Sequence, residues 1–215
     1  MFTNYYNNAQ EAFEELYDLI NKEGYYSAGT KVLHNVGIKL LNPLNNEINT
    51  KWRKWNKNYA EYEWNWYLSE NPNAEEISKI ASIWKGLMDK DGNVNSNYGY
   101  QWSRNNQLTK VIEMLKTTPT TRRASISIYD GKEMDKYNLD TPCTYAINFF
   151  IDNHNKLSMQ VMMRSNDLVF GFCNDQYCFS KIQEHVAKEL NIEIGTYFHF
   201  ACNMHIYERH YNMKL

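Results

Sequence analysis

The stretch from Thr141 to Phe179, TPCTYAINFFIDNHNKLSMQVMMRSNDLVFGFCNDQYCF, decides the fold. It predicts a strand that begins at a cysteine, a turn, a second strand that ends in Arg-Ser-Asn-Asp, a glycine loop, and a helix that opens at Asn-Asp. The two faces of the first strand are predicted to hold Ala146, Asn148 and Phe150 against Tyr145, Ile147 and Phe149. The apolar face of the second strand is predicted to be Leu157, Met159, Val161 and Met163. Between them, residues 152–155 (Asp-Asn-His-Asn) are typical of a hairpin turn.

This hairpin places a thiol and a cation on neighbouring strands. Cys143 stands at the start of the first strand, and Arg164 stands at the end of the second. An arginine or a helix N-terminus close to a thiol lowers its pKa and makes it a nucleophile. The stretch therefore predicts a cysteine nucleophile beside an arginine.

Length and composition indicate one soluble domain over residues 1–215, because a chain of this size can bury a sizeable core. The formal charge of -2 gives no global field for nucleic acid, so an anionic ligand needs a local cationic cluster. No apolar run approaches the roughly 20 residues of a membrane span, and the N-terminus lacks a signal pattern. The four cysteines form no CxxC pair, which favours reduced thiols in the cytoplasm. No His/Cys spacing predicts a metal site.

The rest of the chain alternates between helical and strand-like segments, which supports a mixed α/β (α+β) class. Predicted helices cover Asn8 to Lys22, residues 56–69, a segment from Asn73 to Leu87, residues 104–116, and Asp175 to Leu190 with Asn174 as N-cap. Strand-like segments cover residues 27–43, Ala124 to Tyr129, and the residues that follow Gly195. Five histidines fit no motif and are interpreted as structural or exposed: His34, His154, His185, His199 and His210.

Four motifs in this order resemble the thymidylate synthase family: Pro142-Cys143, Arg164-Ser165-Asn166-Asp167, Gly171 to Asp175, and His205-Ile206-Tyr207. The resemblance implies a mixed twisted sheet flanked by helices, with the sheets of two subunits packed back to back in a homodimer. Asp175 stands where the synthases carry an asparagine that binds uracil. Aspartate at this position and Cys-Thr at the nucleophile are typical of one branch, the phage-type deoxycytidylate hydroxymethylases. This chain resembles that branch. These hydroxymethylases also match the run GNVNSNYG, residues 92–99.

The resemblance assigns roles to particular residues. The catalytic residues it implies are Cys143, Glu63, Tyr98 and Asp175. The nucleotide-binding residues it implies are Lys31, Arg164, Ser165, Asn166, Asp175, His205 and Tyr207, with Arg122 and Arg123 reaching the phosphate in the partner's site. The residues it implies around 5,10-methylenetetrahydrofolate, the co-substrate, are Trp84, Asp167 and Gly171. By pattern alone, Glu63 is a surface residue, Trp84 a core residue and Lys31 a solvated lysine, so these alternatives stay open. The predicted helix 56–69 has a broad aromatic face, and Glu63 lies within it. Desolvation among these rings is expected to raise the pKa of Glu63.

Asp175 indicates which base is bound. An ionised carboxylate only accepts hydrogen bonds, which matches the amino group of cytosine and an N3 that gains a proton during catalysis. Against the O4 of uracil, the same carboxylate would place acceptor against acceptor. Such a buried mismatch costs roughly 1–3 kcal/mol, enough for about tenfold to a hundredfold discrimination. The prediction is therefore a deoxycytidylate (dCMP) 5-hydroxymethyltransferase.

Three alternatives remain: a cytidylate C5-methyltransferase, a hydroxymethylase for the ribonucleotide CMP, and a family member that binds nucleotide without turnover. The chain ends at Leu215, soon after Tyr207. We expect the missing closing tail to leave the reaction intermediate open to water, which favours the hydroxymethyl product. The expected partners are a second copy of the chain, a nucleotide and a folate, in the cytoplasm of a host if the source is viral.

Overall fold

A computed structural model describes residues 2–213. The strands within them form one mixed sheet. The sheet consists of β1 (Phe2–Tyr6), β2 (Tyr25–Ser27), β3 (Thr30–Leu40), β4 (Ser125–Ser127), β5 (Thr144–Ile151), β6 (Lys156–Met163), β7 (Asn166–Asp167) and β8 (Glu193–Tyr207). Its main order is β1-β3-β8-β6-β5-β4, with β2 pairing β3 and β7 pairing β8. The β1–β3, β6–β8 and β7–β8 pairs are parallel and the others antiparallel. The mixed sheet predicted from the sequence is confirmed.

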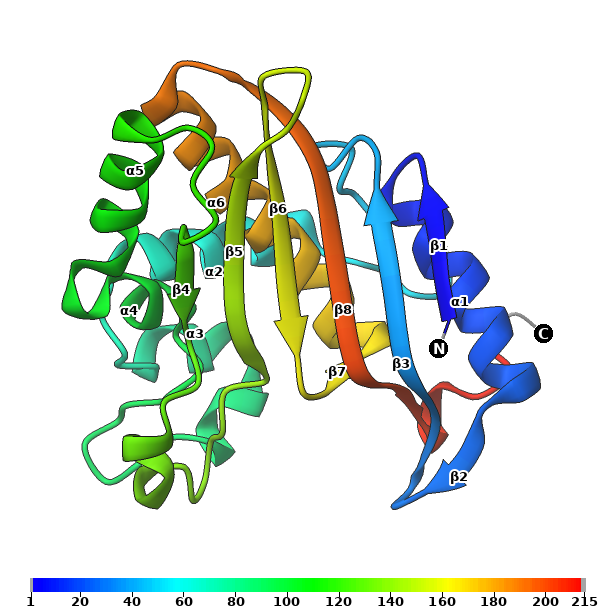
Figure 1. Cartoon of the computed structure of the whole chain (residues 1–215). Coiled ribbons are helices and arrows are strands. Elements are labelled where there is room, and N and C mark those ends of the chain that lie inside the picture. The colour runs from blue at the N-terminus through cyan, green and yellow to red at the C-terminus, as the bar shows by residue number, and fades with distance from the viewer. Residues whose placement is uncertain (1, 214–215) are drawn as a thin grey trace.

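The helices gather behind this sheet in Figure 1. They are α1 (Ala9–Glu23), α2 (Lys57–Leu68), α3 (Glu75–Ile80), α4 (Tyr98–Ser103), α5 (Gln107–Thr117) and α6 (Cys173–Leu190). Helix α6 packs on β6 and β8, and α1 packs on β3. The near face of β5, β6 and β8 carries no helix (Figure 1). No helix within residues 2–213 has the length and apolarity that a membrane span requires.

The core lies between the covered face of the sheet and α6. The predicted apolar face of β6 is confirmed, because its four side chains are fully buried: Leu157, Met159, Val161 and Met163. From α6 they meet Phe179, Ile182 and Val186, which recur at helical spacing and are also fully buried. The sheet therefore holds the hairpin of β5 and β6 rigidly, with Cys143 immediately before one strand and Arg164 immediately after the other.

The predicted alternation of β5 is wrong at its start. A register shift lies between Thr144 and Ala146 in the pairing of β5 with β6. A bulge inserts one residue, so the side chains that precede it lie on the opposite faces from those predicted. Tyr145 is therefore 40 % exposed, while Thr144 is buried. The strand regains the predicted pattern at Ile147 and Phe149, which are buried.

Four further boundaries differ from the prediction. The strand predicted over 27–43 begins only at Thr30, since Ser27 ends β2 and Ala28 and Gly29 form a turn with positive φ angles of 46° and 75°. The helix after Asn73 ends at Ile80 and a 3₁₀ turn, Ser82–Gly86, follows. Helix α5 begins only at Gln107, because the backbone before it is left-handed. Helix α6 begins at Cys173 after a π-helical turn, Leu168–Phe172, so Asn174 lies inside it and is not its N-cap.

The predictions that concern the chain end at Leu215 lie outside the described residues. The single domain over residues 1–215 stays a prediction.

Candidate active site

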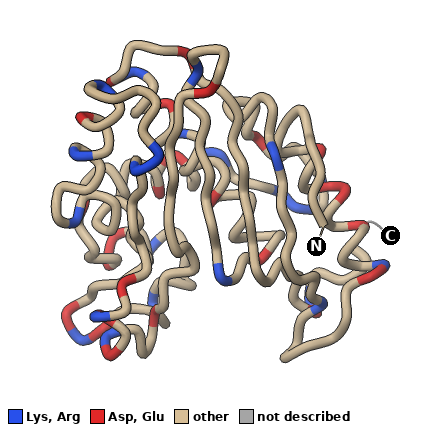
Figure 2. The backbone as a smooth tube through the Cα atoms, in the orientation of Figure 1, with Lys and Arg blue, Asp and Glu red and all other residues tan. Residues whose placement is uncertain are grey.

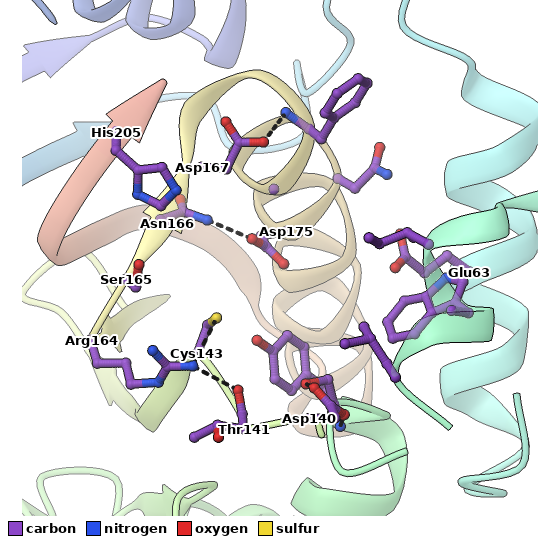
Figure 3. A pocket seen from close by; sticks show the side chains of 18 of the residues that line it. Glu63, Asp140, Thr141, Cys143, Arg164, Ser165, Asn166, Asp167, Asp175 and His205 are labelled. Atoms are coloured by element: carbon purple, nitrogen blue, oxygen red, sulfur yellow. Dashed lines mark hydrogen bonds between the residues drawn. The ribbon is translucent and has the colours of Figure 1, made fainter. Parts of the chain in front are cut away.

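A cavity of about 540 Å³ lies where the ends of β6, β7 and β8 meet α2, the start of α4 and the turn that precedes α6. Figure 3 shows the side chains that converge on it from these elements. Twelve of the residues singled out in the sequence line this cavity: Glu63, Trp84, Tyr98, Cys143, Arg164, Ser165, Asn166, Asp167, Gly171, Asp175, His205 and Tyr207. The fold thus brings Glu63, Trp84 and Tyr98 together with the four motifs between residues 142 and 207.

Three predicted nucleotide-binding residues do not line the cavity. Lys31 donates from Nζ to the carbonyl oxygen of Asn21 at 2.8 Å, and its ammonium lies 5.4 Å from the ring of Tyr26. Arg122 and Arg123 are exposed in the segment between α5 and β4. Their predicted roles toward the phosphate stay predictions.

The thiol and the guanidinium form one wall of the cavity. Arg164 is fixed by donating from Nε to the carbonyl of Pro142 at 3.1 Å and from Nη2 to the carbonyl of Thr141 at 2.9 Å. The same Nη2 lies 3.7 Å from Cys143 Sγ. A backbone bond from Arg164 N–H to the Cys143 carbonyl, 2.8 Å long, ties the two strands together at this point. These bonds hold the positive charge against the sulfur.

The expectation that Arg164 lowers the thiol pKa is only half right. Burial raises the pKa of the Cys143 thiol to about 11, and the charge of Arg164 opposes that rise without cancelling it. The carboxyls of Asp175 and Asp140 add to the rise. Formation of the thiolate at neutral pH therefore depends on a proton acceptor in the cavity.

The opposite wall carries two carboxyls whose pKa values lie near neutrality. Burial raises the pKa of Glu63 to about 8, and the nearby charge of Asp175 adds to this. Tyr67 donates its hydroxyl to Glu63 Oε1 at 3.2 Å, while Oε2 has no partner in the described part of the chain. Desolvation raises the pKa of Asp175 to about 7, against a bond of 2.7 Å from Asn166 Nδ2 to Asp175 Oδ2. The raised pKa predicted for Glu63 agrees with its 6 % exposure, which excludes the surface interpretation.

Tyr98 stands between the two walls at the first residue of α4. Its side chain is buried and its ring stacks on Phe179 with centroids 5.3 Å apart. Gly99 is required here, because a Cβ at this residue would overlap the backbone of Tyr67. Burial raises the pKa of Tyr98 well above its usual value, so its hydroxyl remains protonated. It can pass a proton to or from a neighbouring water.

Sequence reasoning missed a connection between the segments that hold Tyr98 and Cys143. Asp140, which is buried in the cavity lining, accepts from Ser96 N–H and from Ser96 Oγ, each at 2.6 Å. Asn95 Nδ2 donates to the Asp140 carbonyl at 2.8 Å. The run Asn95-Ser96 was noted only as a motif, and no pattern in the sequence pairs it with Asp140. Eight other cavity residues were also missed: Tyr59, Tyr67, Ile83, Leu87, Leu139, Thr141, Phe170 and Asn174.

The mouth of the cavity is aromatic and suits a flat ring. Trp84 is only 8 % exposed and donates from Nε1 to the Tyr59 hydroxyl at 3.0 Å. Phe170 is 47 % exposed, with the guanidinium carbons of Arg53 and Arg209 at 4.9 and 5.5 Å from its ring centre. Asp167 caps the turn that carries Phe170, since its two oxygens accept from Val169 N–H and Phe170 N–H at 3.1 Å each. Trp84 is thus a core residue that also borders the cavity.

Gly171 lets this turn pass close to the polar groups of the cavity. A Cβ at Gly171 would lie 2.9 Å from Asn166 Nδ2 and 3.3 Å from Asp175 Oδ2. Any side chain here would therefore displace the bond between Asn166 and Asp175. Across the mouth, His205 Nδ1 is bonded to Asn203 Oδ1 at 2.9 Å, and burial lowers the pKa of His205. His205 and the exposed Tyr207 lie edge to face, 5.3 Å apart.

No group of three or more His, Cys, Asp or Glu side chains within residues 2–213 is arranged to hold a metal ion.

Comparison with known proteins found one matching family model and several curated relatives. The family model described as "Thymidylate synthase" matches residues 10–214. A thymidylate synthase of Bacillus atrophaeus is 28% identical over 179 residues, which cover 78% of this chain and 78% of that protein. Thymidylate synthase 1 of Bacillus subtilis (strain 168) is 28% identical over 178 residues, covering 78% of this chain and 63% of that protein. A thymidylate synthase of Bacillus phage phi3T is 27% identical over 179 residues, again covering 78% and 63%. The chain thus spans less than two thirds of the latter two relatives.

Proposed function

The chain belongs to the thymidylate synthase family, and from that premise we propose that it is a dCMP 5-hydroxymethyltransferase. It transfers a one-carbon unit from 5,10-methylenetetrahydrofolate to C5 of dCMP, and water completes the hydroxymethyl group. Members of this family use methylenetetrahydrofolate as co-substrate and act on a pyrimidine. The finer assignment to cytosine is carried by one observation. Asp175 lies in the same cavity as Cys143, and Asn166 Nδ2 donates to its Oδ2 at 2.7 Å.

This bond favours cytosine because it fixes Asp175 as a hydrogen-bond acceptor. Figure 3 shows the bond, with the carboxyl of Asp175 directed into the space in front of Cys143. An N–H from Asn166 stabilises the ionised carboxylate. A carboxylate accepts from the amino group and the protonated N3 of cytosine, and it repels the O4 of uracil. The cavity is therefore complementary to dCMP when Asp175 is ionised.

Cys143 supplies the covalent step. Addition of its sulfur to C6 breaks the aromatic system of the base and makes C5 nucleophilic enough to take up the one-carbon unit. The proton that the thiol loses, and later the proton on C5, need acceptors in the cavity. Glu63 and Asp175, with pKa values of about 8 and about 7, exchange protons readily at neutral pH. Tyr98 relays the C5 proton to water, and elimination of the sulfur restores the ring.

The residues at the cavity mouth fit the co-substrate. Trp84 and Phe170 offer apolar ring faces for a flat heterocycle, and Gly171 leaves room beside them. The co-substrate supplies the one-carbon unit. Asp167 is already bonded to Val169 N–H and Phe170 N–H, so we assign it to shaping this mouth.

The assembly we propose is a homodimer through the uncovered face of the sheet. Four large apolar side chains lie on that face: Phe150, Met162, Phe198 and Phe200. Figure 2 shows that the middle of β5, β6 and β8 carries no Lys, Arg, Asp or Glu. Burial of such a face against a second copy removes apolar area from water. Arg122 and Arg123 would then reach the partner's phosphate site, and the dimer would act in the cytoplasm.

A second candidate function is methylation of dUMP, the reaction in the names of the relatives. It is favoured by the pKa of about 7 for Asp175. When protonated, this carboxyl has both a donor and an acceptor, as an asparagine does, and it can then match uracil. Protonation of Asp175 therefore decides between the two bases.

The test measures release of the C5 hydrogen from dCMP, dUMP and CMP separately, with methylenetetrahydrofolate present and the products resolved by mass. We expect release from dCMP with a hydroxymethyl gain. A methyl gain from dCMP would leave the assignment to cytosine intact and overturn water capture. Release from CMP would show that the enzyme acts on the ribonucleotide. Release from dUMP alone would overturn the assignment from Asp175. Binding of nucleotide without any release would identify a non-catalytic member.

A further inference from the structure

Behind Asp175, a buried chain of hydrogen bonds runs through three more side chains into the sheet. Asn166 Oδ1 is bonded to His199 Nε2 at 2.9 Å, and His199 Nδ1 is bonded to the Tyr197 hydroxyl at 2.8 Å. Tyr197 and His199 lie on β8 and are fully buried, and Asn166 is only 3 % exposed. The ring of Phe172 packs edge-on against His199 with centroids 5.3 Å apart. These four residues form a single path from the sheet to the cavity, which we name the Tyr197 relay: Tyr197, His199, Asn166 and Asp175.

The direction of the bonds along this relay has only two self-consistent forms. In the first, Tyr197 donates to His199 Nδ1, Nε2–H donates to Asn166 Oδ1, and the amide N–H₂ donates to an ionised Asp175. In the second every bond is reversed, and a protonated Asp175 donates to Asn166 Oδ1. Each form uses a neutral imidazole with its single proton on a different nitrogen. Burial lowers the pKa of His199 to about 3, so the ring is neutral at physiological pH.

Tyr197 determines which form is adopted. Within residues 2–213, His199 Nδ1 is the one hydrogen-bond partner of its hydroxyl. In the reversed form His199 would be the donor, and the phenol hydrogen would be buried without an acceptor. An unsatisfied buried donor is costly, so the hydroxyl donates and the first form prevails. The amide N–H₂ of Asn166 then faces Asp175, as observed.

We propose that Tyr197 and His199 are positioning residues that select the base, because they hold the N–H₂ of Asn166 toward Asp175 and thereby keep Asp175 an acceptor. This inference rests on the proposed function, since it explains how the preference for cytosine is maintained. Neither side chain lines the cavity, and both act through Asn166. His199, interpreted from the sequence as structural or exposed, is buried and belongs to this relay.

The electrostatic surroundings make such a relay necessary. Among residues 2–213, no cation shifts the Asp175 pKa, and the charged or titratable groups that face Asp175 from the packed elements oppose its ionisation or are neutral. Those groups are Glu63, Tyr59 and Tyr67 from α2, Tyr98 from α4, Cys143 before β5, Asp167 from β7, Cys173 and Cys178 from α6, and Tyr197 from β8. The bond from Asn166 is the contact that lowers the Asp175 pKa, so reversal of the relay would favour the protonated acid.

The experiment compares the wild-type chain with Tyr197→Phe, which removes only the hydroxyl. Affinities for dCMP and dUMP are measured by calorimetry, and kcat/KM for C5 hydrogen release is measured with both nucleotides. We expect the ratio of dCMP to dUMP to fall about tenfold, which corresponds to loss of one buried hydrogen-bond preference. We expect dUMP to gain in affinity, whereas general structural damage would weaken both ligands. The pH at which the ratio changes should also rise.

The matched control is Tyr177→Phe. The Tyr177 side chain is also buried, and its hydroxyl donates to Glu61, outside the relay, in a bond that the variant removes. Its selectivity should equal that of the wild type. A second pair tests His199: His199→Gln keeps an N–H for Asn166 and should retain most of the selectivity, whereas His199→Phe should lose it.

An independent readout is the position of the proton on His199, determined by ¹⁵N NMR of the ligand-free protein. We expect it on Nε2. A proton on Nδ1, or unchanged selectivity in both Tyr197→Phe and His199→Phe, would overturn the relay while leaving the proposed function intact. A wild-type chain that prefers dUMP would overturn the proposed function, and the NMR result would then decide the direction of the relay separately.

Discussion

The two walls of the cavity handle charge in opposite ways. On one wall Arg164 holds a positive charge 3.7 Å from Cys143 Sγ. On the other wall Glu63 and Asp175 are enclosed, and no cation in the described part of the chain contributes to the pKa of either carboxyl. The difference teaches that the charge on the thiol wall only partly offsets the effect of burial on the Cys143 pKa, whereas burial on the carboxyl wall brings two pKa values close to neutrality. A reaction that needs both a nucleophile and proton transfer uses the two walls together.

The largest expected effect comes from removal of the thiol. Cys143→Ser should lower the rate of C5 hydrogen release by at least about a thousandfold, because a serine hydroxyl loses its proton far less readily than a thiol and its oxygen is the weaker nucleophile. Nucleotide affinity, measured by calorimetry, should change only slightly. The control is Cys202→Ser, on β8 and outside the cavity lining, which should keep full turnover. Comparable turnover in Cys143→Ser would rule out the covalent route.

Asp175→Asn exchanges an acceptor for a group that both donates and accepts. It should shift the ratio of kcat/KM for dCMP and dUMP toward dUMP by about a hundredfold, from the cost of a mismatched buried polar pair. In the wild-type chain the same ratio should depend on pH. Above about 7 the carboxyl is ionised and favours dCMP, and below about 7 it is protonated and tolerates dUMP. A ratio that does not vary between pH 5 and pH 9 would contradict this.

Glu63→Gln tests the energetic cost of the carboxyl wall. The folded-state pKa of Glu63 lies above its usual value, so the folded chain keeps a proton that the unfolded chain releases. Stability should therefore fall as pH rises from about 4.5 to about 8, and Glu63→Gln should remove that fall. We expect the variant to be more stable by about 2 kcal/mol at pH 9, with little difference at pH 4, in urea unfolding. The exposed Glu70→Gln serves as the control and should unfold like the wild type at both pH values.

Arg164→Met tests the thiol wall and should have the smallest of these effects. Loss of the guanidinium removes the charge that opposes burial, so the pKa of Cys143 should rise further. The rate of alkylation of Cys143 by iodoacetamide at pH 8 should fall about tenfold. Cys202, in the same molecule, provides the reference rate. An unchanged ratio of the two rates would show that Arg164 does not act on the thiol.

Local patterns were sufficient for much of the fold. The alternation in 156–163 predicts the buried face of β6, and the helical spacing in 175–190 predicts the buried stripe of α6, because each depends only on the period of its own element. The bulge at Thr144 and the π-helical turn before α6 escaped prediction, since each is imposed by the partner against which the segment packs. The helix expected through Leu87 ends at Ile80, and Ile80, predicted for its apolar face, is 53 % exposed.

The same division holds for the site. The sequence by itself determined which chemical groups are available: a thiol, an arginine at the end of the next strand, and an aspartate at the start of the following helix. It did so because residue type sets which atoms can attack, donate or accept. Only the tertiary structure decided how those groups are charged and oriented. Burial outweighs Arg164 at Cys143, brings Glu63 and Asp175 close to neutrality, and joins Tyr197 to Asp175 through His199 and Asn166. Dielectric surroundings and hydrogen-bond direction depend on residues that are distant in the chain, and only folding brings those residues together.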